Sequence, residues 1–173
     1  MTPAIEVLST PRLLLRHLSA DDAAFMLALL NEEPFLRNIG DRGIRTLEDA
    51  AAYVLSGPVA SYERFGFGLY AVELKQSGET LGICGLLKRE TLEDVDVGFA
   101  FLRKFWGRGY AYESAEAVMN YGWNTVGLNR IVAITAPKNH DSIKLLEKLG
   151  LRFEKMIQMP GHPGETALFS AEK

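Results

Sequence analysis

Hydrophobic positions recur along the chain with two spacings, which predict an alternation of strands and helices. Short apolar runs, typical of buried β-strands, cover residues 12–16, 68–74, 81–87, 95–102, 130–136, 151–159 and 166–170. Helical spacing covers residues 20–30, 46–57, 110–125 and 139–149. The predicted hairpins and one strand–helix–strand unit over residues 95–136 indicate a mixed α/β sheet with helices on both faces.

Polar and flexible residues mark where these elements begin and end. Ser19 precedes two aspartates and is typical of a helix N-cap, and Gly150 follows a helical stretch as its C-terminal cap. The second helix is expected to end near Gly57 and Pro58. Residues 31–45 are polar and contain Pro34 and two glycines, so they predict a long loop.

Composition narrows the class of protein. A chain of 173 residues that is 47% hydrophobic suits a single domain, residues 1–173, with one core. The net charge of −3 argues against a nucleic-acid partner, because such proteins carry a surplus of Lys and Arg. A membrane span needs a run of about 18 apolar residues, and the sequence contains none.

The cysteine and histidine content makes two further kinds of site unexpected. Cys84 is the only cysteine, so no disulfide forms within the chain, and this suits a reducing, cytoplasmic setting. The three histidines lie far apart without the spacing of metal ligands. We therefore expect no metal site, and a structural role for the thiol.

A glycine-rich segment, residues 101–111, lies between a predicted strand and a predicted helix. Backbone N–H groups at a helix start have no partner within the helix and carry part of its dipole's positive charge. Gly107 and Gly109 allow successive N–H groups to turn toward one anion, and Arg103, Lys104 and Arg108 add charge. The segment therefore predicts a diphosphate site that needs no metal. A tight turn with a solvated basic face remains the alternative.

Two common phosphate-binding patterns do not fit this segment. A P-loop requires Gly-Lys-Ser/Thr after four spacer residues, and that sequence is missing here. A dinucleotide-binding fingerprint would place its third glycine at Tyr112, and the segment follows a hairpin instead of opening a β–α–β unit.

Three motifs in order resemble one superfamily, the GNAT N-acetyltransferases. They are Lys104-x-x-Gly107-x-Gly109 with Tyr-Ala-Tyr-Glu113 after it, Thr10-Pro-Arg12-Leu-Leu-Leu-Arg16, and Asn139-His-Asp-Ser142 followed by Glu147-Lys148-Leu-Gly150. The residues within these motifs resemble those of one branch of the superfamily, the RimJ/RimL-like enzymes, which acetylate ribosomal-protein N-termini. The resemblance covers about residues 10–153, nearly the whole chain.

This resemblance implies a mostly antiparallel, mixed central sheet that is splayed in the middle, between residues 99–102 and 130–136. The pantetheine arm of acetyl-CoA would lie in the gap, and a main-chain N–H near Phe101 or Leu102 would polarise the thioester carbonyl. The donor contacts carried over from the family are Phe101, Leu102, Lys104, Gly107, Arg108, Gly109, Tyr110, Ala111, Asn139 and Ser142.

Each carried-over role has a structural alternative. The family's commoner acid is a tyrosine, but the matching residue is Leu146, so the resemblance assigns Ser142 a hydrogen bond to the departing sulfur. Ser142 is otherwise a first-turn serine that satisfies a backbone group, and Asn139 is otherwise only an N-cap. Asp96 would orient a water as general base or would be a solvent-facing strand residue. Glu113 would otherwise only complement the helix dipole.

The acceptor is less defined by the sequence. Asn38 and Asp41 lie in the predicted loop that borders the acceptor groove in this family, where an acidic residue suits a cationic amine; a solvated loop is the alternative. An α-amine with a pKa near 8 is about a tenth neutral at pH 7, whereas a lysine amine near 10.4 is roughly 0.04% neutral. An N-terminal acceptor therefore needs little help from a base.

The function that these residues favour is direct acetyl transfer from acetyl-CoA to a primary amine, either a protein N-terminus or a small amine. A non-catalytic CoA-binding or regulatory module of the same fold is the alternative from another class. A nucleotide-binding protein that uses the glycine loop is a third. A monomer and a homodimer both fit the sequence.

Overall fold

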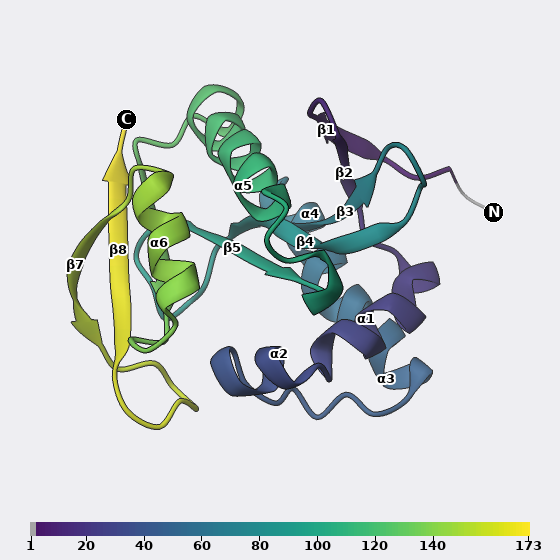
Figure 1. Cartoon of the computed structure of the whole chain (residues 1–173), viewed down its shortest axis with the longest axis horizontal. Coiled ribbons are helices and arrows are strands. Elements are labelled where there is room, and N and C mark those ends of the chain that lie inside the picture. The colour runs from purple at the N-terminus through teal and green to yellow at the C-terminus, as the bar shows by residue number, and fades with distance from the viewer. Residues whose placement is uncertain (1–2) are drawn as a thin grey trace.

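In the computed structural model, which describes residues 3–173, an eight-stranded sheet runs across the molecule (Figure 1). Its order is β1-β2-β3-β4-β5-β6-β8-β7, and every neighbouring pair is antiparallel except β5 and β6. The strands are β1 (Glu6–Ser9), β2 (Leu13–His17), β3 (Leu69–Leu74), β4 (Thr80–Leu87), β5 (Asp96–Phe101), β6 (Arg130–Thr135), β7 (Arg152–Ile157) and β8 (Thr166–Glu172). The predicted mixed, mostly antiparallel sheet is confirmed.

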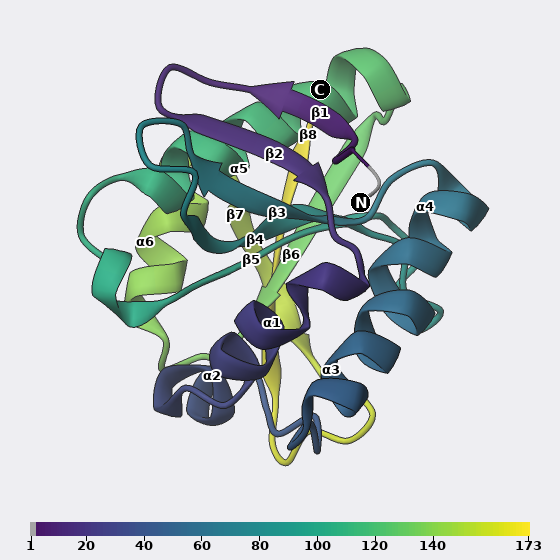
Figure 2. The same cartoon turned by 90° about the vertical axis from the view of Figure 1, so that its right-hand side faces the viewer.

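Helices cover both faces of this sheet, as predicted (Figures 1 and 2). They are α1 (Ala23–Leu30), α2 (Glu33–Asn38), α3 (Leu47–Val54), α4 (Ala60–Phe65), α5 (Tyr110–Tyr121) and α6 (His140–Lys148). Within residues 3–173, none of the helices is long and apolar enough to cross a membrane.

Alternation along the strands produces a core on each face. Tyr70 and Val72 of β3 belong to the core beneath α5, whereas Ala71 between them packs in the core with α1 and α3. Val118 of α5 and Met26 of α1 are fully buried in these two cores. Because both faces are covered, the middle strands expose few side chains to solvent.

The structure differs from the sequence prediction at three places. Strand β1 was not predicted, and it pairs with β2 at the sheet edge. The expected loop over residues 31–45 contains α2, because Pro34 lies in the first helical turn, where no backbone N–H is needed. The second helix does not stop at Pro58: a π-helical turn, Leu55–Val59, accommodates that proline and leads into α4.

The predicted caps are confirmed. The Ser19 hydroxyl oxygen accepts a hydrogen bond from the N–H of Asp21, and the Asp22 carboxylate accepts one from the N–H of Ser19, around a short 3₁₀ turn before α1. Gly150 takes a φ of +93° after α6, a left-handed conformation that favours glycine.

Candidate active site

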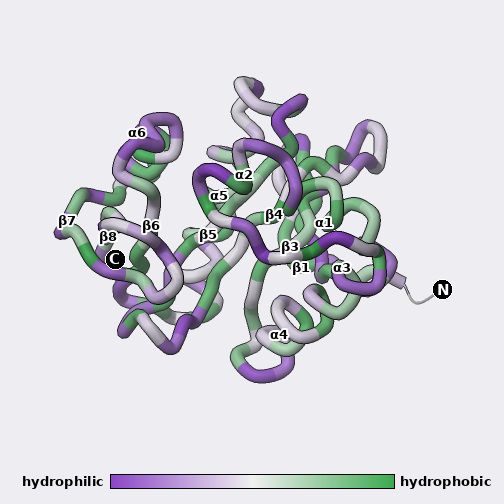
Figure 3. Tube along the Cα trace, turned by 90° about the horizontal axis from the view of Figure 1, so that it is seen from below, coloured by the Kyte–Doolittle hydropathy of each residue, from purple (hydrophilic) through white to green (hydrophobic). Residues whose placement is uncertain are grey.

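Strands β5 and β6 separate soon after they meet, and a cleft opens between them. They pair only at Asp96 and Val132, whereas β4 and β5 pair along six residues. Seen from below, α6 with β6, β7 and β8 stands apart from the block built on β1 to β4, with β5 between them (Figure 3). The cleft has a volume of about 1430 Å³. The predicted splay is confirmed.

The direction of the main-chain groups on β5 decides which amides face this cleft. The N–H of Leu102 donates to the carbonyl of Leu81 on β4 over 3.0 Å. Residues of an antiparallel strand point their N–H and C=O groups to alternate edges. The backbone N–H and C=O groups of Phe99 and Phe101 therefore point the other way, toward β6 and the gap. Of the two amides that were candidates for polarising a carbonyl, only that of Phe101 has the required direction, and the expectation for Leu102 is wrong.

After β5 the chain makes the turn that was predicted as a phosphate site. A 3₁₀ turn, Arg103–Phe105, is followed by Gly107 at φ +77° and Gly109 at φ +82°, and α5 starts at Tyr110. Both glycines hold left-handed conformations that an L-residue adopts only with strain. Gly107, Gly109, Tyr110 and Ala111 all line the cleft. The N-terminal end of α5 thus presents its amides to one end of the cavity.

Not every charge of the loop faces the cleft. The Lys104 side chain is 64% exposed, and its Nζ lies 3.2 Å from Glu79 in the β3–β4 hairpin. The carbonyl of Arg108 accepts a hydrogen bond from Arg12 on the far side of the loop. In this structure the Lys104 ammonium therefore pairs with Glu79 instead of facing the cleft, and its contribution to an anion site stays a prediction.

Asn139 and Ser142 lie together at the start of α6 and both line the cleft. The Oδ1 of Asn139 accepts the backbone N–H of Ser142 over 3.3 Å, so the N-cap role is confirmed. The cap uses the amide of Ser142 and leaves its hydroxyl out of that bond. Leu146, one turn further, is 1% exposed and packs in the core.

Asp96 lies at the opposite end of β5 from the glycine loop and also lines the cleft. Its side chain is 1% exposed, so the alternative of a solvent-facing strand residue is wrong. Burial raises the pKa of Asp96 to about 6, and the nearby Arg89 guanidinium limits the rise. A carboxylate of this kind is a suitable proton acceptor near neutral pH.

Two segments, residues 38–42 and 160–163, border the cleft on the side where the sequence predicted the acceptor. They approach each other where a Cβ at Gly40 would lie 3.9 Å from Cε1 of His162. Asn38 ends α2 and lines the cleft. Asp41 lines it as well, but its carboxylate accepts from Arg45 and from the N–H of Gly43, and the hydrogen bond from Arg45 lowers its pKa. Its charge is therefore already compensated within the loop.

Sequence reasoning missed several residues of the cleft. Arg89, which pairs with Asp96, comes from the turn between β4 and β5. Lys144 and Lys148 lie on the cleft side of α6, and the Lys148 ammonium lies 4.1 Å from the ring centroid of Tyr112 on α5. The spacing of four residues between these lysines was the available signal, since it places both on one helical face.

The cleft lacks a cluster suited to a metal. Among residues 3–173, no group of three or more His, Cys, Asp or Glu side chains is placed to hold an ion. Cys84 lies in the core, where burial raises its thiol pKa to about 12. It is therefore protonated and poorly suited to nucleophilic catalysis.

Comparisons with known proteins agree with this geometry. The profile of the acetyltransferase (GNAT) domain matches residues 12–152. The YkkB protein of Bacillus subtilis (strain 168) is 30% identical over 158 residues, which are 90% of this chain and 91% of YkkB. The uncharacterized N-acetyltransferase YoaA of the same organism is 26% identical over 96% of this chain and 97% of its own length.

Solved structures show the same fold. An acetyltransferase from Agrobacterium tumefaciens str. C58 superposes with a TM-score of 0.82 at 23% identity and covers 100% of this chain and 96% of its own. RimL, a ribosomal L7/L12 alpha-N-protein acetyltransferase in complex with coenzyme A, gives a TM-score of 0.81 at 15% identity, with 96% and 97% of the two chains covered. The profile match over most of the chain, together with this fold, shows that the protein belongs to the GNAT acetyltransferase family and is an acetyl-CoA-dependent acyltransferase.

Proposed function

We propose that this protein transfers the acetyl group of acetyl-CoA directly to the α-amine of a protein N-terminus. The observation that supports the proposal is that one cleft is lined by the glycine loop, Ser142 and Asp96, with Asp96 at the opposite end of β5 from the glycine loop. A donor bound along the β5–β6 gap would place its thioester between these groups.

The donor contacts are assigned by position. The amides of residues 107–111 hold the diphosphate, and Asn139 and the backbone of Phe99 hold the pantetheine arm. The N–H of Phe101 polarises the acetyl carbonyl. A serine is a weak acid, so the Ser142 hydroxyl acts by a hydrogen bond to the departing sulfur or by relaying a proton from water.

The transfer needs no covalent enzyme intermediate. The neutral amine nitrogen bonds to the acetyl carbonyl carbon while the carbon–sulfur bond breaks. The proton that the amine loses passes to Asp96 through a water, and the sulfur gains a proton through Ser142. A base with a pKa of about 6 suits an α-amine, which is about a tenth neutral at pH 7, better than a lysine side chain.

The alternatives differ in measurable ways. A small-molecule amine would use the same chemistry with another acceptor. A non-catalytic CoA-binding module would bind acetyl-CoA without turnover, and Leu146 at the family's usual tyrosine position favours that reading. RimL, the neighbour that acts on the N-terminus of L7/L12, supports a protein acceptor.

An acceptor screen tests the proposal by following thiol release from acetyl-CoA. Peptides with a free α-amine are compared with the same peptides blocked at the N-terminus but carrying a lysine, and with small amines. We expect release only with the free α-amine. Thiol release with small amines alone would indicate a small-molecule acceptor instead of a protein N-terminus. Binding of acetyl-CoA without thiol release would favour the non-catalytic module.

Thermal denaturation provides a second test. A ligand that binds only the folded state raises the melting temperature. We expect acetyl-CoA to raise it and ATP and NAD to leave it unchanged. A shift with ATP or NAD but none with saturating acetyl-CoA would contradict both the acetyltransferase and the CoA-binding module.

A further inference from the structure

Glu113, in the first turn of α5, binds the turn between β1 and β2, about a hundred residues earlier in the chain. Its Oε1 accepts from Nε of Arg12 over 2.8 Å. Its Oε2 accepts from the backbone N–H of Arg12 over 3.1 Å and from the Thr10 hydroxyl over 2.6 Å. Both carboxylate oxygens are therefore engaged, and complementing the helix dipole is not this residue's only role.

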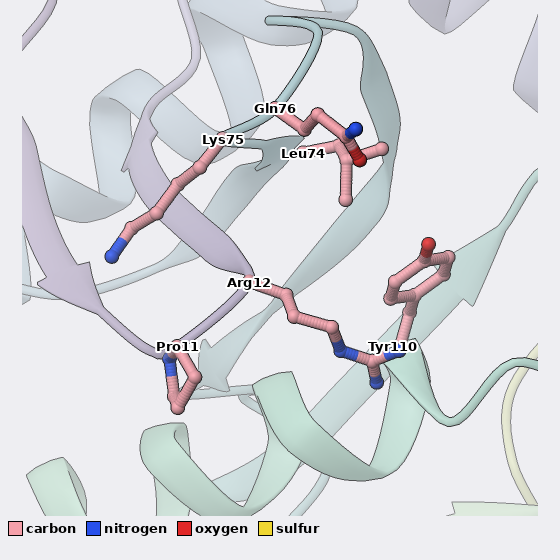
Figure 4. Close-up of a pocket in the computed structure, with 6 residues that line it drawn as sticks. All are labelled: Pro11, Arg12, Leu74, Lys75, Gln76 and Tyr110. Carbon is pink, nitrogen blue, oxygen red and sulfur yellow. The ribbon is translucent and has the colours of Figure 1, made fainter.

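The same arginine also reaches the glycine loop. Arg12 Nη1 donates to the carbonyl of Arg108 over 3.0 Å, and the guanidinium lies 4.5 Å from the ring centroid of Tyr110. A Cβ at Gly109 would lie 3.3 Å from Arg12 Nη2. Figure 4 shows Arg12 extended from the start of β2 to Tyr110 at the start of α5.

Peptide geometry gives this contact a consequence for the amide. In a trans peptide, the C=O of one residue and the N–H of the next point in opposite directions. The carbonyl of Arg108 points at Arg12, so the N–H of Gly109 points away from Arg12. Gly109 lines the cleft, whereas Arg12 is not among the cleft's lining residues. The orientation of one peptide plane thus links Arg12 to the proposed anion site.

We propose that Arg12 is a positioning residue that aims the Gly109 N–H at the diphosphate of the acyl donor, with Glu113 fixing the guanidinium. The inference rests on the proposed binding of acetyl-CoA at this loop. Arg12 is 45% exposed, and an ion pair this exposed adds little to folding stability. Its effect therefore lies mainly in the geometry of the loop.

The test compares two acyl donors, acetyl-CoA and S-acetylpantetheine, which lacks the diphosphate. For Arg12→Met, the expected loss is about 10- to 100-fold in kcat/KM with acetyl-CoA, through KM, the size expected for a hydrogen bond to a charged group. With S-acetylpantetheine, kcat/KM should stay within about twofold of the wild type, because that donor has no group for the Gly109 amide.

Two further variants serve as controls. Arg12→Lys keeps the charge but lacks the planar fork that reaches Glu113 and the Arg108 carbonyl together, so it should remain impaired with acetyl-CoA. Arg130→Met removes an arginine that pairs with Asp94 and Glu154 at the start of β6, and it should leave both donors unaffected.

Equal losses with the two donors would overturn the proposal, because they would indicate a general structural role. An unchanged KM for acetyl-CoA in Arg12→Met would overturn it as well. The dissociation constant of CoA is measured alongside, since binding needs no acceptor. A wild-type protein that binds CoA but acetylates nothing contradicts the proposed function, whereas equal CoA affinity in the wild type and Arg12→Met contradicts the role of Arg12.

Discussion

Asp96 and Arg89 form an ion pair across the β4–β5 turn whose two members differ in their contact with solvent. The Nε of Arg89 lies 3.1 Å from Oδ1 of Asp96, and the side chains are 33% and 1% exposed, respectively. Water therefore stabilises the cation more than the carboxylate. This asymmetry explains why burial raises the pKa of Asp96 to about 6 although an arginine is its partner.

The pH dependence of catalysis should follow Asp96. Asp96 must be ionised to act as a base, and the acceptor amine, with a pKa near 8, must be neutral. We therefore expect kcat/KM to fall about a hundredfold per pH unit below pH 6 and about tenfold per unit between pH 8 and pH 6, and to level off above pH 8. Asp96→Asn should remove the lower inflection and reduce the plateau. Steady-state rates between pH 5 and 9 measure both effects. An inflection near 6 that persists in Asp96→Asn would assign it to another group.

Asp96 should also destabilise the folded protein at neutral pH. Its pKa is raised in the folded state, so the folded chain binds the proton more tightly, and stability falls as pH rises from about 4 to 6. Above that range the penalty is roughly 3 kcal/mol, since each pKa unit corresponds to about 1.4 kcal/mol. Asp96→Asn should therefore melt higher than the wild type at pH 7 while it is less active. The control is Asp94→Asn, which alters a partly exposed ion pair with Arg130 and should change neither the melting temperature nor the activity.

Ser142→Ala should lower kcat about 10- to 100-fold and change KM for acetyl-CoA little, the size of a hydrogen bond to developing charge. The backbone N–H that Asn139 accepts remains in this variant, so its melting temperature should equal that of the wild type. Stopped-flow thiol release and thermal denaturation provide the two measurements. A wild-type kcat would exclude Ser142 from the reaction.

Asn139 combines two roles that two substitutions can separate. Asn139→Ala removes the side chain that accepts the N–H of Ser142 and should cost about 1 kcal/mol of stability. Asn139→Ser keeps an N-cap oxygen but loses the amide NH₂ that we assign to the pantetheine arm. Both variants should raise KM for acetyl-CoA, and only the alanine should lower the melting temperature. An unchanged KM in Asn139→Ser would limit Asn139 to capping.

The elements that the sequence predicted well have local signals. Gly107 and Gly109 interrupt a strand-to-helix junction, and such a turn is recognisable because few other residues adopt positive φ. Ser19 and Asn139 were recognisable as caps because the cap bond spans only two or three residues. The splay of β5 from β6, by contrast, came from family resemblance, since strand periodicity carries no information on which neighbour a strand leaves.

Other features depend on contacts distant in sequence. Arg12 and Glu113 are 101 residues apart, and nothing local to either predicts their pairing. The direction of Lys104 depends on Glu79 in another hairpin. The sequence left two roles open for Asp96, and only the fold excludes the solvent-facing one, because both faces of the middle of this sheet are covered.

A substitution at Gly109 tests whether the backbone conformation of the glycine loop contributes to binding of the donor. It holds a φ of +82°, and an added Cβ would lie 3.3 Å from Arg12 Nη2. Gly109→Ala should therefore lose roughly 1–2 kcal/mol of stability from the left-handed backbone. It should also displace Arg12 or the loop, so that KM for acetyl-CoA rises by more than the loss of stability explains.

Gly127 is the matched control for this prediction. It ends the π-helical turn after α5 with a φ of +84°, and a Cβ there would meet nothing within 4 Å. Gly127→Ala should show the same backbone strain, a similar fall in melting temperature, and an unchanged KM. If both alanine variants raised KM equally, the effect would come from reduced stability. If Gly109→Ala kept a wild-type KM, the amide of Gly109 would have no part in holding the donor, and the contact between Arg12 and the Arg108 carbonyl would be structural alone.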